Sequence, residues 1–182
     1  MAHTKKHRFN KHQKSKTPQK SMASRADIHV LYEQSVQCVE SEIDFVDETF
    51  QKLRGRKAVL LREDFCGTAN TSCEWIRRRK STEAVSVDLN KDVLVWGRKH
   101  NVGKLTDEQA KRITLINDNV LNVDTGKVDT ALAMNFSYWI FEDRPTMVKY
   151  FKRVYKSLVD DGIFFLDAFG GYEAYQEMKE RT

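Results

Sequence analysis

Five short apolar runs, each separated from the next by a stretch with helical periodicity, constrain the fold of this chain more than any other feature of its sequence. The runs are residues 58–62, 83–88, 113–116, 128–134 and 163–168. The last is apolar at consecutive positions, as expected of a strand that is covered on both faces. Strands that alternate with helices at this spacing favour a parallel sheet between two layers of helices. We therefore predict an α/β fold whose doubly wound sheet is mostly parallel.

Helices are predicted between these runs because apolar residues recur there at three- and four-residue spacing. Residues 27–54 predict one long helix or two shorter ones, which should lie across the sheet as a lid before the first strand. Further helices are predicted over residues 70–79, 91–101, 106–112, 144–159 and 172–181. Thr68 or Asn70 could cap the first of these, residues 106–109 have the pattern of a capping box, and residues 160–162 should end the helix before the last run.

The charge of the chain is uneven, because residues 1–26 hold eight Lys and Arg and no acidic residue. Residues 27–182 hold the other 23 basic residues and all 26 acidic ones. Residues 1–26 have almost nothing apolar to bury, so we predict that this basic tail is disordered. It could be a solubilising tail, a contact for RNA, DNA or acidic partners, or an organelle transit peptide. The basic run at residues 77–79 is expected to be a solvated helix end.

Cysteine usage and hydropathy indicate a cytoplasmic protein. Cys38, Cys66 and Cys73 lack the paired close spacing of a zinc site or a disulfide framework, so we predict a reducing compartment and no metal site. No apolar run approaches the ~18–20 residues of a membrane span. The N-terminus also lacks an apolar stretch that could form the core of a secretory signal. We expect no contact with a membrane.

Polar residues gather where the predicted strands end. They are Glu63, Asp64, Asp88, Asp118, Asn119, Asn135 and Asp167. The carboxyl ends of parallel strands share one edge of a sheet, so one ligand could contact most of these side chains. Asp88 lies 21 residues after Gly67, which is the spacing at which a carboxylate after the second strand binds the hydroxyls of a ribose. His29 and His100 stand alone, and we assign them no catalytic role.

In order and spacing, these segments resemble the class I S-adenosylmethionine (SAM)-dependent methyltransferases. Residues 63–69 (EDFCGTA) are similar to the first motif of that family, and residues 87–89 (VDL) to its second-strand acid. Residues 117–119 (NDN) look like the adenine-binding segment, residues 128–135 like the fourth strand, and residues 158–166 like the helix-turn-strand that follows. The resemblance covers about residues 27–171.

The resemblance implies a Rossmann-like fold, strand order 3-2-1-4-5 and SAM as the cofactor. Glu63 would bind the methionine end, Asp88 the ribose, and Asp118 with the backbone amide of Asn119 the adenine. Tyr32, on the lid helix, could close over the cofactor or belong to the core. The full set of implied cofactor-binding residues is Tyr32, Glu63, Phe65, Gly67, Asp88, Leu89, Asp118, Asn119 and Asn135. No catalytic residue is assigned, since methyl transfer depends mainly on positioning and desolvation.

The first turn departs from the family pattern. Where the family usually has three glycines, this chain has Phe65, Gly67 and Ala69, so we expect the backbone to approach the methionine part of the cofactor less openly. A dinucleotide-binding dehydrogenase matches less well, because G-x-G-x-x-G is absent.

Asn135 begins a second departure. Residues 135–138 (NFSY) lie where enzymes that methylate amino groups of nucleic acids carry Asn/Asp-Pro-Pro-aromatic, but the prolines are missing here. Alternatively, Asn135 lines the cofactor pocket while Phe136, Tyr138 and Trp139 pack under the following helix.

The family fold normally continues with a helix and an antiparallel hairpin. Residues 163–168 would otherwise form a bare apolar edge, so we expect a fragment, or an oligomer or partner that covers this edge.

If the chain is a methyltransferase, its methyl acceptor is unknown and could be a small molecule or a nucleic acid. The alternative function is a non-catalytic or truncated methyltransferase-like protein that binds nucleic acid through its basic tail.

Overall fold

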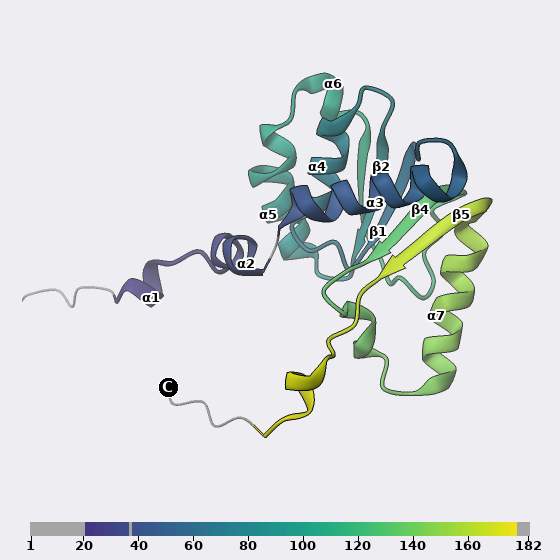
Figure 1. Ribbon diagram of the computed structural model, residues 1–182. Helices are drawn as coiled ribbons and strands as arrows, with labels where there is room; N and C mark the ends of the chain where they lie inside the picture. The colour runs from purple at the N-terminus through teal and green to yellow at the C-terminus, as the bar shows by residue number, and fades with distance from the viewer. Residues whose placement is uncertain (1–20, 37, 178–182) are drawn as a thin grey trace, which may run out of the picture.

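The computed structural model describes residues 21–36 and 38–177, which contain one sheet of five parallel strands (Figure 1). Its order is β3-β2-β1-β4-β5. The strands are β1 (Leu60–Asp64), β2 (Glu83–Asp88), β3 (Ile113–Asn117), β4 (Val128–Ala133) and β5 (Leu158–Leu166). The predicted α/β class and the predicted strand order are confirmed.

Helices cover both faces of this sheet and give it two separate cores. The α-helices are α1 (Met22–Arg25), α2 (Ile28–Val36), α3 (Val39–Arg54), α4 (Asn70–Arg78), α5 (Lys91–His100), α6 (Asp107–Ala110) and α7 (Arg144–Ser157). The 3₁₀ turns of the described residues are η1 (Val102–Lys104), η2 (Ser137–Ile140) and η3 (Tyr172–Tyr175). Helices α3, α4 and α5 pack on one face, and α7 packs on the other.

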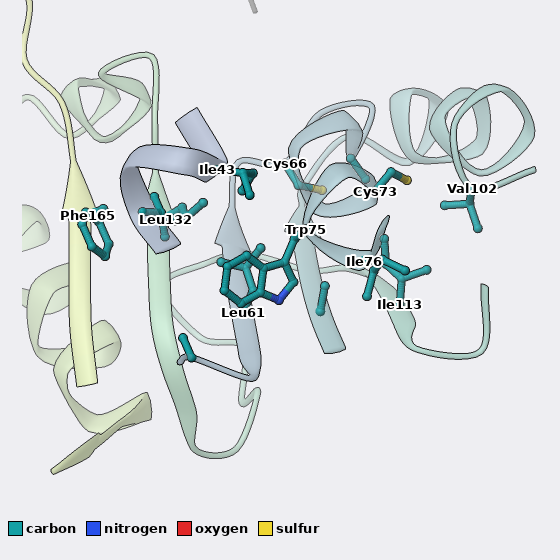
Figure 2. Packing of buried hydrophobic residues seen from close by; sticks show 14 of the residues in the cluster. Ile43, Leu61, Cys66, Cys73, Trp75, Ile76, Val102, Ile113, Leu132 and Phe165 are labelled. Carbon is teal, nitrogen blue, oxygen red and sulfur yellow. The ribbon is translucent and has the colours of Figure 1, made fainter. Parts of the chain in front are cut away.

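The core under α3 and α4 is built around Trp75 (Figure 2). Its ring is fully buried beside Leu61 and Ile76, and its indole N–H donates to the carbonyl oxygens of Val59 at 3.2 Å and Glu83 at 3.1 Å. The indole thereby satisfies its polar atom while it contributes a large apolar area. This packing fixes α4, and with it the turn between β1 and α4.

The predicted lid is two helices, α2 and α3, and they differ in burial. Helix α3 lies across the sheet (Figure 1) and buries Val39, Ile43, Val46 and Phe50. It ends at Gly55, whose positive φ of 68° permits the bond from its N–H to the Gln51 carbonyl. Helix α2 buries none of its described residues. The lid therefore has an anchored half and an exposed half.

Two predictions about helix ends are wrong. The run at residues 77–79 is not simply solvated, because Arg78 and Arg79 form ion pairs with Asp44 and Asp47 of α3. The N-cap of α4 is Ala69, not Thr68 or Asn70, and its side chain makes no cap bond. The capping box at residues 106–109 is confirmed.

The segment after α7 also differs from the prediction. Residues 160–162 lie inside β5, which begins at Leu158, instead of ending a helix. The pairing of β5 with β4 shifts between Val128 and Thr130, which is the irregularity that admits this segment. Gly162 has no room for a side chain there, since an added Cβ would lie 3.1 Å from the Asp129 carbonyl oxygen.

Both termini fall largely outside the described residues. Of the predicted basic tail, residues 1–20 are outside them, and residues 22–25 form the single exposed turn of α1. The predicted helix over residues 172–181 is described only as far as residue 177. Its first residues form the 3₁₀ turn η3 instead of an α-helix. Among the described residues, no helix has both the length and the apolar character that crossing a membrane requires.

Candidate functional site

The turn between β1 and α4 has a left-handed backbone at alternate residues. The φ angles are 57° at Phe65, 53° at Gly67 and 56° at Ala69. These are the three positions at which the family pattern has glycines, so the backbone keeps the conformation although two of the glycines are replaced. A left-handed residue with a Cβ costs roughly 1–2 kcal/mol, and the rest of the structure must compensate this strain.

Glu63 contributes to that compensation from the strand. Its carboxylate accepts hydrogen bonds from the backbone N–H of Ser72, at 3.0 Å, and from the Ser72 hydroxyl. The Ser86 hydroxyl in turn donates to the Ser72 oxygen at 2.7 Å. Burial raises the pKa of Glu63 to about 7, although the bonds from Ser72 lower it. Glu63 thus binds the first turn of α4, where sequence reasoning had placed a side-chain N-cap.

Asp88 ties the end of β2 to the same turn. One carboxylate oxygen accepts the backbone N–H of Gly67 at 2.8 Å, and the other accepts that of Asn90 at 2.8 Å. Each carboxylate oxygen has two lone pairs, so both oxygens can accept a further bond from a ligand hydroxyl. Asp88 can therefore organise the turn and bind a diol at once.

The end of β3 is closed by local hydrogen bonds. The Asp118 carboxylate accepts the backbone N–H of Asn119 at 2.7 Å, and the Asn119 side chain accepts that of Leu121 at 2.9 Å. The side chain of Asn117 donates to the carbonyl oxygens of Asp88 and Leu89. The Asn119 amide that was expected to meet adenine is therefore bonded within the chain in this structure.

Asp167, after β5, holds the turn that follows β4. Its carboxylate accepts the backbone N–H groups of Asn135 at 3.0 Å and Phe136 at 2.6 Å. Both residues are left-handed, with φ of 55° and 43°. Asp167, which the sequence analysis placed among the strand-end polar residues, therefore caps a turn.

The aromatic residues after Asn135 are arranged differently from the expected packing. Tyr138 is buried and its ring lies 6.0 Å from that of Phe151 in α7. Phe136 and Trp139, however, are 41% and 47% exposed and contact each other. Of the three aromatics that were expected to pack under the helix, only Tyr138 is therefore buried.

All nine predicted site residues line one of two cavities at this edge. The first cavity, of about 140 Å³, is lined by His29, Tyr32, Glu63, Asp64, Phe65, Cys66, Gly67, Thr68, Thr71, Val93, Met134, Asn135 and Ser137. The second, of about 340 Å³, is lined by Phe65, Asp88, Leu89, Asn90, Asp118, Asn119, Val120, Ile140 and Phe141. Phe65 belongs to both linings, so the cavities adjoin at its side chain.

The two cavities differ in chemistry. The lining of the first includes Glu63 and Asp64 and neither Lys nor Arg. The Asp64 side chain is inaccessible to solvent, because it pairs with Arg62 at 2.8 Å and accepts the Tyr150 hydroxyl at 2.9 Å. The second cavity sets apolar side chains such as Leu89, Ile140 and Phe141 beside its acids. Sequence reasoning missed Ile140 and Phe141, which no local pattern distinguishes from core residues.

Helix α2 borders the first cavity and is attached by polar and aromatic contacts. Glu33 accepts hydrogen bonds from the Thr68 hydroxyl at 2.5 Å and the Asn101 amide at 2.6 Å. The Trp96 indole donates to Asp27 at 2.8 Å and contacts the His29 ring. Tyr32 lines the cavity and is 44% exposed, so it is not a core residue.

A scan against protein-family models and a search of curated protein sequences found no match to this chain. Solved structures do match. A sugar N-methyltransferase from Streptoalloteichus superposes with a TM-score of 0.67 at 15% identity, covering 85% of this chain and 58% of its own. A SAM-dependent methyltransferase from Clostridium acetobutylicum gives 0.62 at 19%, covering 76% and 55%. The glycopeptide N-methyltransferase MtfA gives 0.62 at 18%, covering 90% and 68%.

The chain spans little more than half the length of the first two matched structures. It covers 58% of one and 57% of the other. At these identities the likeness concerns the fold alone. The sheet of this chain has the order β3-β2-β1-β4-β5. This chain therefore has the fold of the class I SAM-dependent methyltransferases.

Proposed function

We propose that this protein is a SAM-dependent methyltransferase whose cofactor lies across the two adjoining cavities. The observation that carries the proposal is the hydrogen bond between Asp88 and Gly67. It joins a residue of the second cavity, Asp88, to a residue of the first, Gly67. A ligand with a cationic end, a central diol and an apolar planar end would match this order of groups.

The residues present fit SAM on these grounds. The ammonium and sulfonium charges suit a cavity that carries Glu63 and has neither Lys nor Arg in its lining. The ribose hydroxyls suit the lone pairs that Asp88 has left, and the adenine ring suits the side chains of Leu89 and Phe141 with Asp118 beside them. Of the nine predicted site residues, Asp88, Leu89 and Asp118 are therefore proposed to contact the nucleoside with their side chains.

When bound, SAM supplies an activated methyl group. The chain's own contribution is to orient that group and to exclude water, which needs no dedicated acid or base. Tyr32 on α2 borders the first cavity. The matched structures include a sugar N-methyltransferase and a glycopeptide N-methyltransferase, and from them we extend to this chain methyl transfer alone. The acceptor stays open between a small molecule and a nucleic acid.

Isothermal titration of the full chain with SAM tests the proposal. We expect saturable binding at one site per chain, and no heat of binding with NADH, because the chain lacks the dinucleotide fingerprint. Folding of the same sample is checked by its cooperative thermal unfolding. A folded sample that shows no SAM binding would remove the enzymatic proposal.

A further inference from the structure

Helix α7 carries a strong positive charge that the proposed methyl transfer does not use. The helix has five basic residues and no acidic residue in its sequence RPTMVKYFKRVYKS. A groove of about 440 Å³ runs along it, lined by Leu121, Pro145, Val148, Lys149, Lys152, Arg153 and Lys156. Four of these seven residues are cationic. We call this surface the α7 groove.

The cations of the α7 groove are not neutralised by acids. Among residues 21–36, 38–172, 174, 176 and 177, no carboxylate lies within ion-pair distance of any of the four. Arg153 donates instead to the carbonyl oxygens of Val123 at 2.6 Å and Asn122 at 2.7 Å, and Lys149 to the Asn122 side chain at 3.2 Å. These neutral partners hold two cations in place and leave their charge available.

In a second basic region, several of the cations are paired with acids. A hollow of about 680 Å³ is lined by Arg77, Arg78, Arg79, Lys80, Lys111, Arg112 and three neighbours. Here Arg78 pairs with Asp44, Arg79 with Asp47, and Lys111 with Glu108. The larger hollow is therefore substantially neutralised, and the α7 groove is the surface that favours an anion.

The groove continues into a hollow that contains an exposed aromatic ring. This hollow, of about 320 Å³, shares Lys156 with the groove and adds Lys127 and Tyr155, together with one acid, Asp160. Tyr155 is 79% exposed, although burying an aromatic ring is normally favourable. A row of cations with an exposed aromatic beside it is the arrangement that binds single-stranded nucleic acid, because phosphates meet the cations and a base stacks on the ring.

The groove also begins close to the proposed cofactor site. Pro145 lies in the first turn of α7, and Leu121 directly follows Val120, which lines the second cavity. From there α7 runs beside β5 in the opposite direction, toward the amino ends of the strands (Figure 1). Lys149 and Lys156 are about 10 Å apart along the helix axis at the usual rise per residue. That separation suits a chain of phosphates better than a single one.

We propose that the α7 groove binds single-stranded nucleic acid, with Lys149, Lys152, Arg153 and Lys156 on the phosphates and Tyr155 stacked on a base. The test is fluorescence anisotropy of the full chain with a fluorescein-labelled oligouridine of about 16 nucleotides, the upper end of single-strand site sizes. Lys152→Glu/Lys156→Glu should lower the affinity at least about 10-fold. It should also reduce the slope of log affinity against log salt by about 1.4, or about 0.7 for each lost phosphate contact.

Lys80→Glu/Lys111→Glu is the matched control, since it changes the net charge equally on the second basic region. We expect this control to stay within about twofold of the unaltered protein. Tyr155→Ala should weaken binding several-fold, and Tyr155→Phe should retain it because the ring still stacks. Thermal unfolding shows that each variant is folded, and all four altered lysines are exposed.

Three results would overturn the proposal. The groove variant could bind like the unaltered protein, which would assign the affinity to residues 1–26. Both double variants could lose affinity equally, which would reduce the effect to net charge. Polyglutamate could compete as well as the oligouridine, with Tyr155→Ala unchanged, which would make the surface one for acidic proteins.

Discussion

The Glu63 carboxylate accepts both the backbone N–H and the hydroxyl of Ser72, so one residue of β1 holds the first turn of α4. Glu63 also belongs to the lining of the cavity proposed for the cationic end of SAM. Its position therefore links the stability of the turn to the charge of the site.

The pH dependence of stability should show this link. Burial raises the pKa of Glu63 from 4.5 to about 7. Between these pH values the native state binds more protons than the unfolded state, so the free energy of unfolding falls as the pH rises. The loss is on the order of 3 kcal/mol at 1.36 kcal/mol per pKa unit. We expect Glu63→Gln to remove this fall, as measured by urea unfolding at several pH values.

Glu83→Gln serves as the control, because Glu83 is exposed and lies outside both cavities. It should keep the pH dependence of the unaltered protein. If Glu63→Gln and Glu83→Gln gave the same curve of stability against pH, the buried carboxylate would not be its source.

Asp88→Ala tests the ribose contact. Loss of charge-assisted hydrogen bonds should weaken SAM binding by ~1.5–3 kcal/mol in isothermal titration. Part of that loss comes through the turn, since Asp88 also holds the N–H of Gly67 at 2.8 Å. Asp92→Ala is the control, because Asp92 is an exposed acid in the first turn of the next helix. Equal affinities for the two variants would refute the role of Asp88.

The sheet order and the position of the site could be predicted because each strand end coincides with a change from apolar to polar residues. The prediction for β2, residues 83–88, agrees with the structure at both ends, and Asp88 closes it. All nine predicted site residues lie around the two cavities for the same reason: parallel strands bring their carboxyl ends to one edge.

The details of the turns could not be predicted, because they depend on contacts between distant residues. Local preference disfavours a left-handed Phe136, yet Asp167, 31 residues away, accepts its N–H. The start of β5 was missed for a similar reason. Residues 160–162 have the composition of a turn, and pairing with β4 draws them into a strand.

Gly97→Ala should destabilise the protein, because Gly97 in α5 lies against the turn between β1 and α4. A Cβ at Gly97 would lie 2.7 Å from the carbonyl carbon of Thr68 and still closer to its oxygen. Because these are backbone atoms, α5 or the turn must move, at a cost of roughly 1–3 kcal/mol. Gly103→Ala is the control, since its nearest atom would be the Arg98 carbonyl oxygen at 3.4 Å. Urea unfolding should separate the two variants, and equal losses would contradict this account of the contact.

The buried pair of Arg62 and Asp64 gives the sharpest prediction about the core. Both side chains are inaccessible to solvent, and burial raises the pKa of Asp64 while the Arg62 guanidinium, at 2.8 Å, opposes the rise. Asp64→Asn would leave a buried guanidinium without its counter-charge, so the free energy of unfolding should fall by about 3–5 kcal/mol. Tyr150→Phe removes a hydroxyl that donates to the Asp64 carboxylate at 2.9 Å and should cost about 1.5–3 kcal/mol, as for other hydrogen bonds to a charged group.

The double variant Arg62→Leu/Asp64→Leu distinguishes the energy of the pair from the penalty of breaking it. Replacing both charges with apolar groups removes the desolvation cost together with the attraction, so the double variant should lose less stability than Asp64→Asn. Urea unfolding of the three variants measures this order. If the double variant were the least stable, the ion pair itself would contribute net stability, because its attraction would then exceed the cost of burying two charges in β1.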